Sequence, residues 1–507
     1  MKREELSPRP VNQGLSKENL GMLNYLLGVL TQPANRWDGF YTPQSASMNF
    51  ALRYQLAFAT YAVAQMSQRT PAYRAPYIEA MRSAIRRMLD VAVWGYWRAS
   101  AEGEEQERAL SSGHAAILLN THNRLPAGPP TDPIARDNLQ YSGHLSTMLG
   151  LYFKLSGDET YNKAFTLQDP VSGVTFRYTY SQVAERIYSQ MKRNNFGGVC
   201  CEPGMAYVPC NNYAMASNTL HDALFSTRYS EANNAWLDTV KRKLVLKGPA
   251  ARGVFGTAYM KDFHMATPIA FNFTDVWGMS FLMPFSRPLV RKLYGKMKSK
   301  FARAGTGSAY VGSSNVSERM EISDVPINTA FGLLLARGMA DKELGEAFAR
   351  YARHMFGACW DGNRYSYAAA PRTLQTTALY ALASSVEWGG ETFAQLFTGR
   401  PHRLDEPCLL EAYDENGGVG VTRAYYDPTE RSLKFTLCIL GEADSLRPTG
   451  PVQSRVKIGN LPGKPVVEIG GSPIADTDWV LDAGGTLSFA TPVLPEKETK
   501  CVVRMPV

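Results

Sequence analysis

Helical periodicity runs through most of this chain and then stops, and this feature constrains the fold more than any other. Between residues 17 and 399, apolar residues recur every three or four positions, which is the spacing of helices that bury one face. Glycine, proline, asparagine or serine separates most of these segments. The segments with the clearest periodicity are residues 50–66, 77–93, 145–155, 180–191, 213–225, 232–246, 281–301, 328–335, 344–355 and 374–382.

Many helices joined by short links, without alternating strand patterns between them, predict a mainly α fold. We expect paired helices arranged in a ring, an (α/α)6-type toroid that occupies residues 1–403. Helices in an open solenoid would show the same periodicity, so closure of the ring is an inference.

The last part of the chain has a different character. Short segments rich in β-branched and aromatic residues alternate with turn-forming pairs such as Asp427-Pro428, Pro462-Gly463 and Gly484-Gly485. This pattern predicts a small β-sandwich domain at residues 404–507. Its expected strands are residues 408–413, 419–426, 433–440, 454–458, 465–469, 486–489 and 500–505.

The positive charge of the chain does not by itself indicate a nucleic-acid partner. The formal net charge is +8, but the basic residues are mostly scattered. The densest stretch, residues 287–303, is typical of an amphipathic helix that turns its apolar residues inward and its cations to solvent. We therefore expect no nucleic acid as a partner. No apolar run has the length of a membrane span, so we expect no stable membrane insertion either.

The cysteines and the first residues suggest a cytoplasmic protein. Seven cysteines are an odd number and make a poor disulfide framework for a chain of this size. The start of the sequence lacks the apolar core of a secretory signal. Three cysteines, Cys200, Cys201 and Cys210, nevertheless lie within eleven residues, and this clustering calls for an explanation.

A histidine and this cysteine cluster are the main candidates for chemistry. We place His144 at the start of a predicted helix, where the helix dipole favours a neutral imidazole that can accept a proton. Residues 197–212 are broken by glycine and proline and are predicted to form a loop before a helix at Tyr213. Four interpretations of Cys201 and Cys210 are open: a zinc site with His144, a disulfide, an acid/base thiol pair, or buried structural cysteines. Because the spacing matches no common zinc motif, we expect no metal.

Both segments resemble motifs of the linalool dehydratase/isomerase family. Members of that family carry a Tyr-x-Gly-His segment followed by a Cys-Glu-Pro loop that ends in Cys-Asn. The corresponding residues here are Tyr141-Ser142-Gly143-His144 and Cys201-Glu202-Pro203 through Cys210-Asn211. The similarity extends through residues 24–25, 52–58 and 331–337, and so covers most of the helical part but not the terminal β segments.

The resemblance implies an (α/α) barrel and cofactor-free chemistry on a terpene alcohol. It places His144 and Tyr54 in the acid/base set, and Cys201 and Cys210 near the reacting carbons of the substrate. It also allows a homo-oligomer. The residues that we expect to line the substrate pocket are Tyr141, Glu202, Tyr207, Asn211, Trp37 and Asp38.

One family residue has no counterpart. In the family, an aspartate that works with the histidine follows an Asn-Tyr-Ile run, and the matching position here is Leu27. Asp38, in a neighbouring turn, is a candidate replacement, although an Asp-Gly pair also simply forms turns. A long irregular stretch, residues 99–137, is a candidate lid.

These observations predict an enzyme of specialised metabolism that isomerises, dehydrates or cyclises a small hydrophobic, terpenoid-like substrate. If the lost aspartate has changed the reaction, the same pocket would suit a pericyclic, Diels-Alder-type cyclase that mainly holds its substrate in a reactive shape. Two further alternatives are a polysaccharide lyase built from a toroid and a sandwich, and a non-catalytic protein that binds a hydrophobic ligand.

Overall fold

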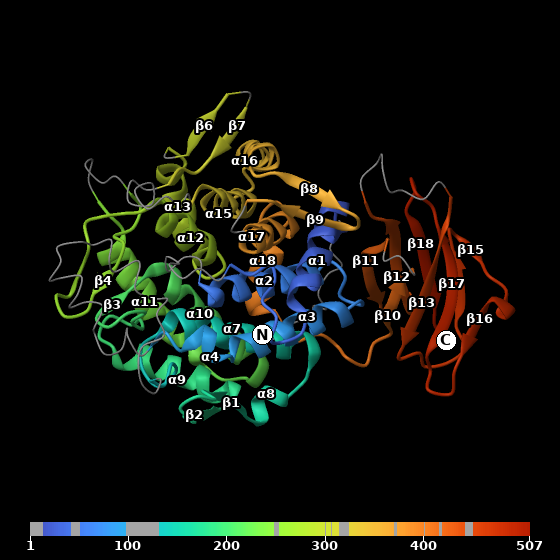
Figure 1. Ribbon diagram of the computed structural model, residues 1–507, viewed down its shortest axis with the longest axis horizontal. Coiled ribbons are helices and arrows are strands. Elements are labelled where there is room, and N and C mark those ends of the chain that lie inside the picture. Colours follow the sequence, from blue (N-terminus) through green and yellow to red (C-terminus); the bar gives the residue numbers. More distant parts are fainter. Residues whose placement is uncertain are drawn as a thin grey trace.

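A computed structural model describes most of the chain. The described ranges are residues 14–41, 51–97, 131–247, 253–299, 301–305, 307–313, 324–369, 373–399, 401–414, 418–441 and 450–506. Most of the candidate lid, namely residues 99–130, lies outside them. The described part consists of a helical body followed by β-sheets near the C-terminus (Figure 1).

Six helices form the inner layer of the helical body and close a ring. Each packs against the next in chain order, and the last packs back against the first, which distinguishes the arrangement from an open solenoid. Nearly all their residues are buried, as expected for helices with neighbours on every side. They are α2 (Leu52–Ser67), α7 (Leu139–Ser156), α10 (Val208–Phe225), α12 (Asn272–Leu282), α15 (Val325–Gly338) and α17 (Thr373–Ser385).

Further helices cover this ring from outside, and they are amphipathic. In the basic stretch at residues 287–303, for example, the helix buries Val290, Leu293 and Met297 and exposes most of its cations, namely Arg291, Lys292 and Lys298. The outer helices are α1 (Lys17–Leu30), α3 (Ala75–Met88), α9 (Tyr180–Arg193), α11 (Asn233–Thr239), α13 (Arg287–Lys298), α16 (Lys342–Met355) and α18 (Glu391–Thr398). Shorter helical turns are α4 (Val91–Trp94), α8 (Thr160–Lys163) and the π-turn η5 (Val240–Leu244).

Short antiparallel strands, which the sequence does not predict, connect several of the helices. With two to four residues each, they are too short to show an alternating pattern. They are β1 (Phe165–Gln168) with β2 (Thr175–Tyr178), β3 (Met205–Ala206) with β4 (Tyr259–Met260) and β5 (Met265–Ala266), β6 (Ala302–Ala304) with β7 (Ser308–Tyr310), and β8 (Ala358–Asp361) with β9 (Arg364–Tyr367).

The C-terminal part consists of two antiparallel sheets, and its β-rich character agrees with the sequence. One sheet has the order β10 (Cys408–Tyr413), β13 (Val452–Gly459), β17 (Leu487–Val493) and β16 (Trp479–Leu481). The other has the order β11 (Val419–Asp427), β12 (Ser432–Ile439), β18 (Thr499–Arg504), β14 (Val466–Ile469) and β15 (Ser472–Pro473). Most buried side chains from both sheets share one apolar cluster with Ala72, while Cys438 and Leu440 pack in the core of the helical body. The division at residue 404 stays a prediction.

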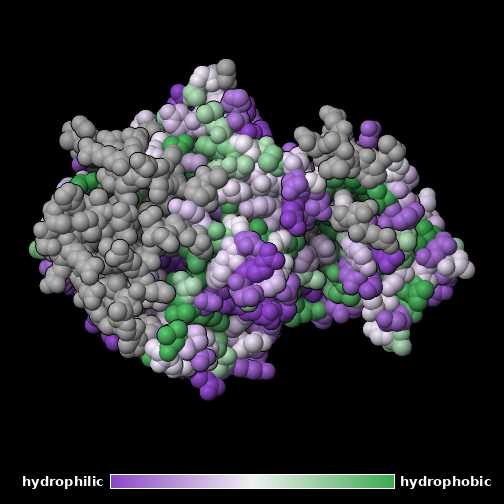
Figure 2. Space-filling view, in the orientation of Figure 1, coloured by the Kyte–Doolittle hydropathy of each residue, from purple (hydrophilic) through white to green (hydrophobic). Residues whose placement is uncertain are grey.

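Backbone hydrogen bonds join the sheets to the helical body. The Ala72 nitrogen, in the turn after α2, donates to the Ala424 carbonyl at 3.1 Å, and the Ala72 carbonyl accepts from the Leu409 nitrogen at 2.7 Å. Before α1, the Leu15 nitrogen donates to the Thr422 carbonyl at 2.8 Å. The strands β10 and β11 therefore lie against the helical body, and the sheets form a lobe that meets it at a narrower waist (Figure 2).

Candidate active site

The residues expected to carry chemistry come from the first turns of three neighbouring inner helices. Tyr54 lies in the first turn of α2, His144 in the second turn of α7, and Cys210 in the first turn of α10. Because α2 packs on α7 and α7 packs on α10, these turns meet at one end of the ring. Cys201 comes from the loop that precedes α10.

The loop with the cysteines is shorter than predicted. The helix α10 begins at Val208 rather than at Tyr213, and Pro209 stands in its first turn. Proline is tolerated there because the first amide groups of a helix need no partner within the helix. Cys210 and Asn211 are therefore held by a helix, and only residues 197–207 form the loop.

His144 is fully buried and is held in its neutral form. Its pKa lies well below the usual value, first because burial disfavours the imidazolium and second because the Arg53 charge is close. The helix α7 begins at Leu139, so His144 lies beyond the first turn, where the helix dipole has little effect. The neutral imidazole expected from the sequence is thus present in the structure, but for a different physical reason.

The hydrogen bonds around His144 determine which ring nitrogen carries the proton. The Nδ1 atom lies 2.8 Å from the Tyr61 hydroxyl, and either of the two can supply the hydrogen. When Nδ1–H donates to Tyr61, Nε2 is unprotonated and can act as a base. When the hydroxyl donates to Nδ1, the imidazole proton is on Nε2. Nε2 is buried and has no hydrogen-bond partner among the described residues.

The two thiols predicted to act together are in contact. Cys201 and Cys210 are buried, and their side chains are hydrogen-bonded to each other. Burial, and to a smaller extent this contact, raises the pKa of the Cys201 thiol well above its usual value. Cys201 therefore keeps its proton at neutral pH, and both cysteines are free thiols.

A buried polar chain connects Tyr54 to the cysteine loop. The Tyr54 hydroxyl donates to Gln140 Oε1 at 2.9 Å, and Gln140 Nε2 donates to Glu202 Oε1 at 2.6 Å. The Arg53 guanidinium also donates to Gln140 Oε1, at 3.1 Å, and its carbon lies 4.7 Å from the centre of the Tyr54 ring. Burial raises the pKa of Tyr54, while the Arg53 charge opposes that rise. Sequence reasoning missed Arg53 and Gln140, although both stand beside residues of the quoted motifs.

Other predicted pocket residues have structural contacts instead. The Tyr141 hydroxyl donates to the Met88 carbonyl at 2.9 Å, on the side of α7 that faces α3. Asn211 accepts from the Val199 nitrogen at 2.8 Å and donates to the Val199 carbonyl at 3.0 Å, so it holds the cysteine loop in place. Tyr207 is closer to the chemistry, because Glu202 and both thiols contribute to its raised pKa after the larger effect of burial.

Asp38 does not lie against His144. Its carboxylate is 66% exposed and pairs with Arg36, and Trp37 lies in the same half-buried turn. Leu27, at the position of the family aspartate, lies on the outer helix α1. The described polar partner of His144 is the Tyr61 phenol.

Aromatic rings fill the space beside the imidazole. The Phe58 ring lies 5.9 Å from that of His144, and the Trp277 ring lies 5.4 Å from that of Tyr54. Beyond them is a cavity of about 10 Å³, lined also by Phe331 and Asn328, which is room for about one water molecule. Any molecule larger than a water therefore needs these rings to move before it can bind there.

Among the residues that the structure describes, no three His, Cys, Asp or Glu side chains converge as metal ligands. None of the described helices is both long and apolar enough to cross a bilayer.

Comparison with known proteins gives one family and several remote structures. The model of the family described as "Linalool dehydratase/isomerase" matches residues 53–372, which include the histidine and cysteine motifs but not residues 24–27. An α-1,6-mannanase of Salegentibacter sp. is 12% identical over 74% of this chain and 99% of its own, with a TM-score of 0.38. An unsaturated glucuronyl hydrolase specific for heparin is 10% identical over 73% of this chain and 96% of its own, with a TM-score of 0.40. Likenesses this remote say nothing about the activity of this chain.

Proposed function

The chain belongs to the linalool dehydratase/isomerase family, and on this premise we propose that it is an acid/base lyase or isomerase of a small, terpenoid-like alcohol. The observation that carries the proposal is the buried, unpartnered Nε2 atom of His144 beside Tyr54, which is a proton acceptor in the tautomer whose Nδ1–H donates to Tyr61. The ring of six helices and the two C-terminal sheets support an (α/α)6-type toroid with a β-sandwich as its scaffold.

In the proposed dehydration, His144 is the base and Tyr54 is the acid. Tyr54 gives its proton to the substrate hydroxyl, the carbon–oxygen bond breaks, and water leaves. His144 Nε2 removes a proton from the neighbouring carbon, and the electrons of that carbon–hydrogen bond form the new double bond. The imidazolium then returns a proton to the phenolate. In the isomerisation, the water that left attacks the far carbon of the allylic cation, and the proton it then loses returns to the Tyr54 phenolate.

The surroundings of Tyr54 and His144 suit this chemistry. The Arg53 guanidinium beside Tyr54 offsets the charge of a phenolate. The faces of Phe58 and Trp277 stabilise a transient allylic cation and exclude water. The Cys201–Cys210 pair supplies a neutral, polarisable wall beside the reacting carbons.

The test uses purified protein with linalool and with its primary allylic isomer, and products are separated by gas chromatography. We expect turnover, and we expect His144→Ala to lower kcat/KM by about 10²- to 10⁴-fold, the usual contribution of a general base. Tyr141→Phe is the matched control, since its hydroxyl bonds the backbone away from the site, and it should keep most of the activity. A His144→Ala variant that is folded and as active as the wild type would refute the proposal.

A pericyclic cyclase is the second candidate, and the Tyr61 phenol in place of a carboxylate on His144 favours it. The two candidates differ in hydrogen chemistry, because a pericyclic closure removes no carbon-bound proton. A substrate deuterated next to the carbinol carbon should react more slowly in the acid/base enzyme and at an unchanged rate in the cyclase. A wild-type protein that binds linalool without converting it would instead indicate the non-catalytic ligand-binding protein.

A further inference from the structure

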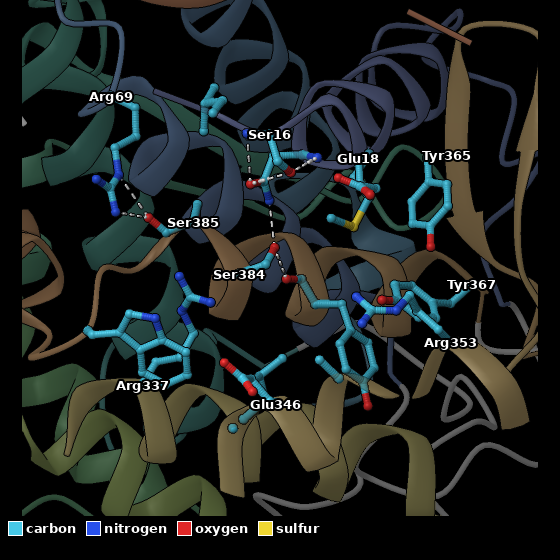
Figure 3. A pocket seen from close by; sticks show the side chains of 18 of the residues that line it. Ser16, Glu18, Arg69, Arg337, Glu346, Arg353, Tyr365, Tyr367, Ser384 and Ser385 are labelled. Carbon is cyan, nitrogen blue, oxygen red and sulfur yellow. Dashed lines mark hydrogen bonds between the residues drawn. The ribbon is translucent and has the colours of Figure 1, made fainter. Parts of the chain in front are cut away.

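A second cavity lies at the opposite end of the inner helices from His144. It has a volume of about 260 Å³ and is bordered by the segment before α1, by α16, by β9 and by the final turns of α15 and α17 (Figure 3). Arg69 borders it just after α2, whereas Tyr54 lies at the start of that helix. Fifteen residues of helix separate the two, or about 20 Å, so this cavity is distinct from the candidate active site.

Cations line this cavity in excess over carboxylates. Arg69 is already satisfied, because its guanidinium donates to the Ser385 carbonyl at 2.8 Å and pairs with Glu387 at 3.4 Å. Glu346 has its own partner, Arg350, at 3.9 Å. Once these pairs are set aside, the lining keeps two guanidinium groups, those of Arg337 and Arg353, and one carboxylate, that of Glu18.

Arg337 and Arg353 keep donors available. Arg337 Nε donates to the Val386 carbonyl at 2.5 Å, and its guanidinium carbon lies 4.6 Å from the centre of the Trp388 ring. Within the described part of the chain, neither terminal nitrogen of Arg337 has a hydrogen-bond partner. Burial, and then repulsion from Arg69, lowers the pKa of Arg337 to about 10, so a bound anion would relieve a real electrostatic cost. In the close-up, Arg337 and Arg353 approach the cavity from opposite sides (Figure 3).

The remaining wall is aromatic and holds one unsatisfied hydroxyl. Tyr380 is 1% exposed, and its hydroxyl has no partner among the described residues. Its ring stacks on that of Tyr367 with 4.4 Å between centres, and Tyr365 continues the same surface. The hydroxyl itself is closed off from the cavity, so this wall offers a ligand aromatic surface rather than a hydrogen bond.

We propose that this cavity is a binding site for a small organic monoanion, a carboxylate with a flat apolar group. The carboxylate lies between Arg337 and Arg353, whose planar donors match its two oxygens. The apolar group lies against Tyr365 and Tyr367. Among the described lining residues, Arg337 and Arg353 carry two positive charges and Glu18 carries one negative charge. The net positive charge of one is neutralised by a monoanion. The volume is below that of a typical drug-sized site, so the ligand is about the size of a single substituted ring.

The test measures binding of benzoate to the full-length protein by isothermal titration calorimetry. Benzyl alcohol serves as the uncharged analogue and phenyl phosphate as the dianion. We expect benzoate to bind with a Kd of about 0.1–1 mM, a reasonable affinity for a ligand of this size, and to bind at least tenfold more tightly than either analogue. Binding should weaken as NaCl is added. No binding of benzoate at 10 mM, about ten times the highest expected Kd, or tighter binding of phenyl phosphate, would overturn the proposal.

Three variants test whether benzoate binds in this cavity. Arg353→Gln removes an exposed cation and so should leave the fold intact, and we expect it to weaken benzoate binding at least tenfold. Tyr380→Phe removes only a hydroxyl that does not reach the cavity, so it should leave benzoate binding unchanged. Arg242→Gln, which changes an equally exposed arginine on η5, is the matched control and should bind as the wild type does. Equal affinity of all three variants would place any bound benzoate elsewhere and refute the assignment.

Discussion

The proton position on His144 depends on a hydrogen-bond chain that two conservative substitutions interrupt at different points. In the tautomer that the proposed base requires, Tyr61→Phe removes the acceptor of Nδ1–H, while Thr147→Val removes the acceptor of the Tyr61 hydroxyl. Both positions are buried, and neither substitution changes the size of the side chain by more than about one atom. The two variants are expected to differ in stability although both lose activity.

Tyr61→Phe leaves a buried Nδ1–H without a partner. We expect it to lower the free energy of unfolding by about 1–3 kcal/mol, the usual cost of such a group. Because this cost falls only on the tautomer with its proton on Nδ1, the tautomer with a basic Nε2 is no longer favoured. At about 1.4 kcal/mol for each factor of ten, we expect kcat to fall about ten- to hundredfold, with little change in KM.

Thr147→Val leaves Tyr61 able to turn its hydroxyl toward Nδ1. The imidazole then accepts at Nδ1 and carries its proton on Nε2, where a base is needed. We therefore expect a similar loss of kcat with a smaller loss of stability, below about 1 kcal/mol, because every strong donor still has a partner.

Urea unfolding gives the stabilities, and nitrogen NMR of histidine-labelled protein reports the tautomer directly, without a substrate. The wild type should show an unprotonated Nε2 and Thr147→Val a protonated one. Tyr141→Phe is the control for loss of a tyrosine hydroxyl from the same region, and it should change stability but not the tautomer. A protonated Nε2 in the wild type, or full activity in Tyr61→Phe, would contradict the reasoning.

Two further predictions concern stability. Asn211→Leu should lower the free energy of unfolding by about 2–4 kcal/mol, measured by urea unfolding, because it leaves the buried Val199 nitrogen and carbonyl unpaired; an unchanged stability would show that the loop does not depend on Asn211. Burial lowers the pKa of His144 well below its usual value, that of His221 to about 4 and that of His402 to about 3. Below about pH 6.5 these histidines therefore bind protons in the unfolded chain but not in the folded chain. The free energy of unfolding should fall by up to about 1.4 kcal/mol per pH unit for each histidine. Equal stabilities at pH 7.5 and 5.5 would contradict the burial of these groups.

Periodicity and turn chemistry predict much of the fold. All ten quoted helical segments overlap helices of the structure, and all seven quoted β segments overlap strands. The omissions have physical reasons: β3, β4 and β5 span two residues each, too few to show a pattern. The helix α10 begins earlier than predicted. The sequence pattern assigns Pro209 to a loop, whereas the structure has it in the first turn of the helix.

The candidate site was predicted in its residue types but not in its connections. Cys201 and Cys210 are close in sequence, and the structure places their thiols in contact. Tyr61 and His144, in contrast, are 83 residues apart. Their contact depends on how α2 packs against α7, which the periodicity of either helix does not specify. The contact between Gln140 and Glu202, which are 62 residues apart, likewise depends on packing that the sequence pattern does not specify.

The junction at Ala72 and Leu15 combines main-chain hydrogen bonds with side-chain packing. Ala72 lies in the apolar cluster of the sheets, while Cys438 and Leu440 lie in the core of the helical body. The match to the family ends at residue 372, before the first strand of the sheets. The hydrogen bonds tolerate most residues, but the packed side chains do not, so a change at Cys438 or Leu440 should disturb the helical body as well as the sheets.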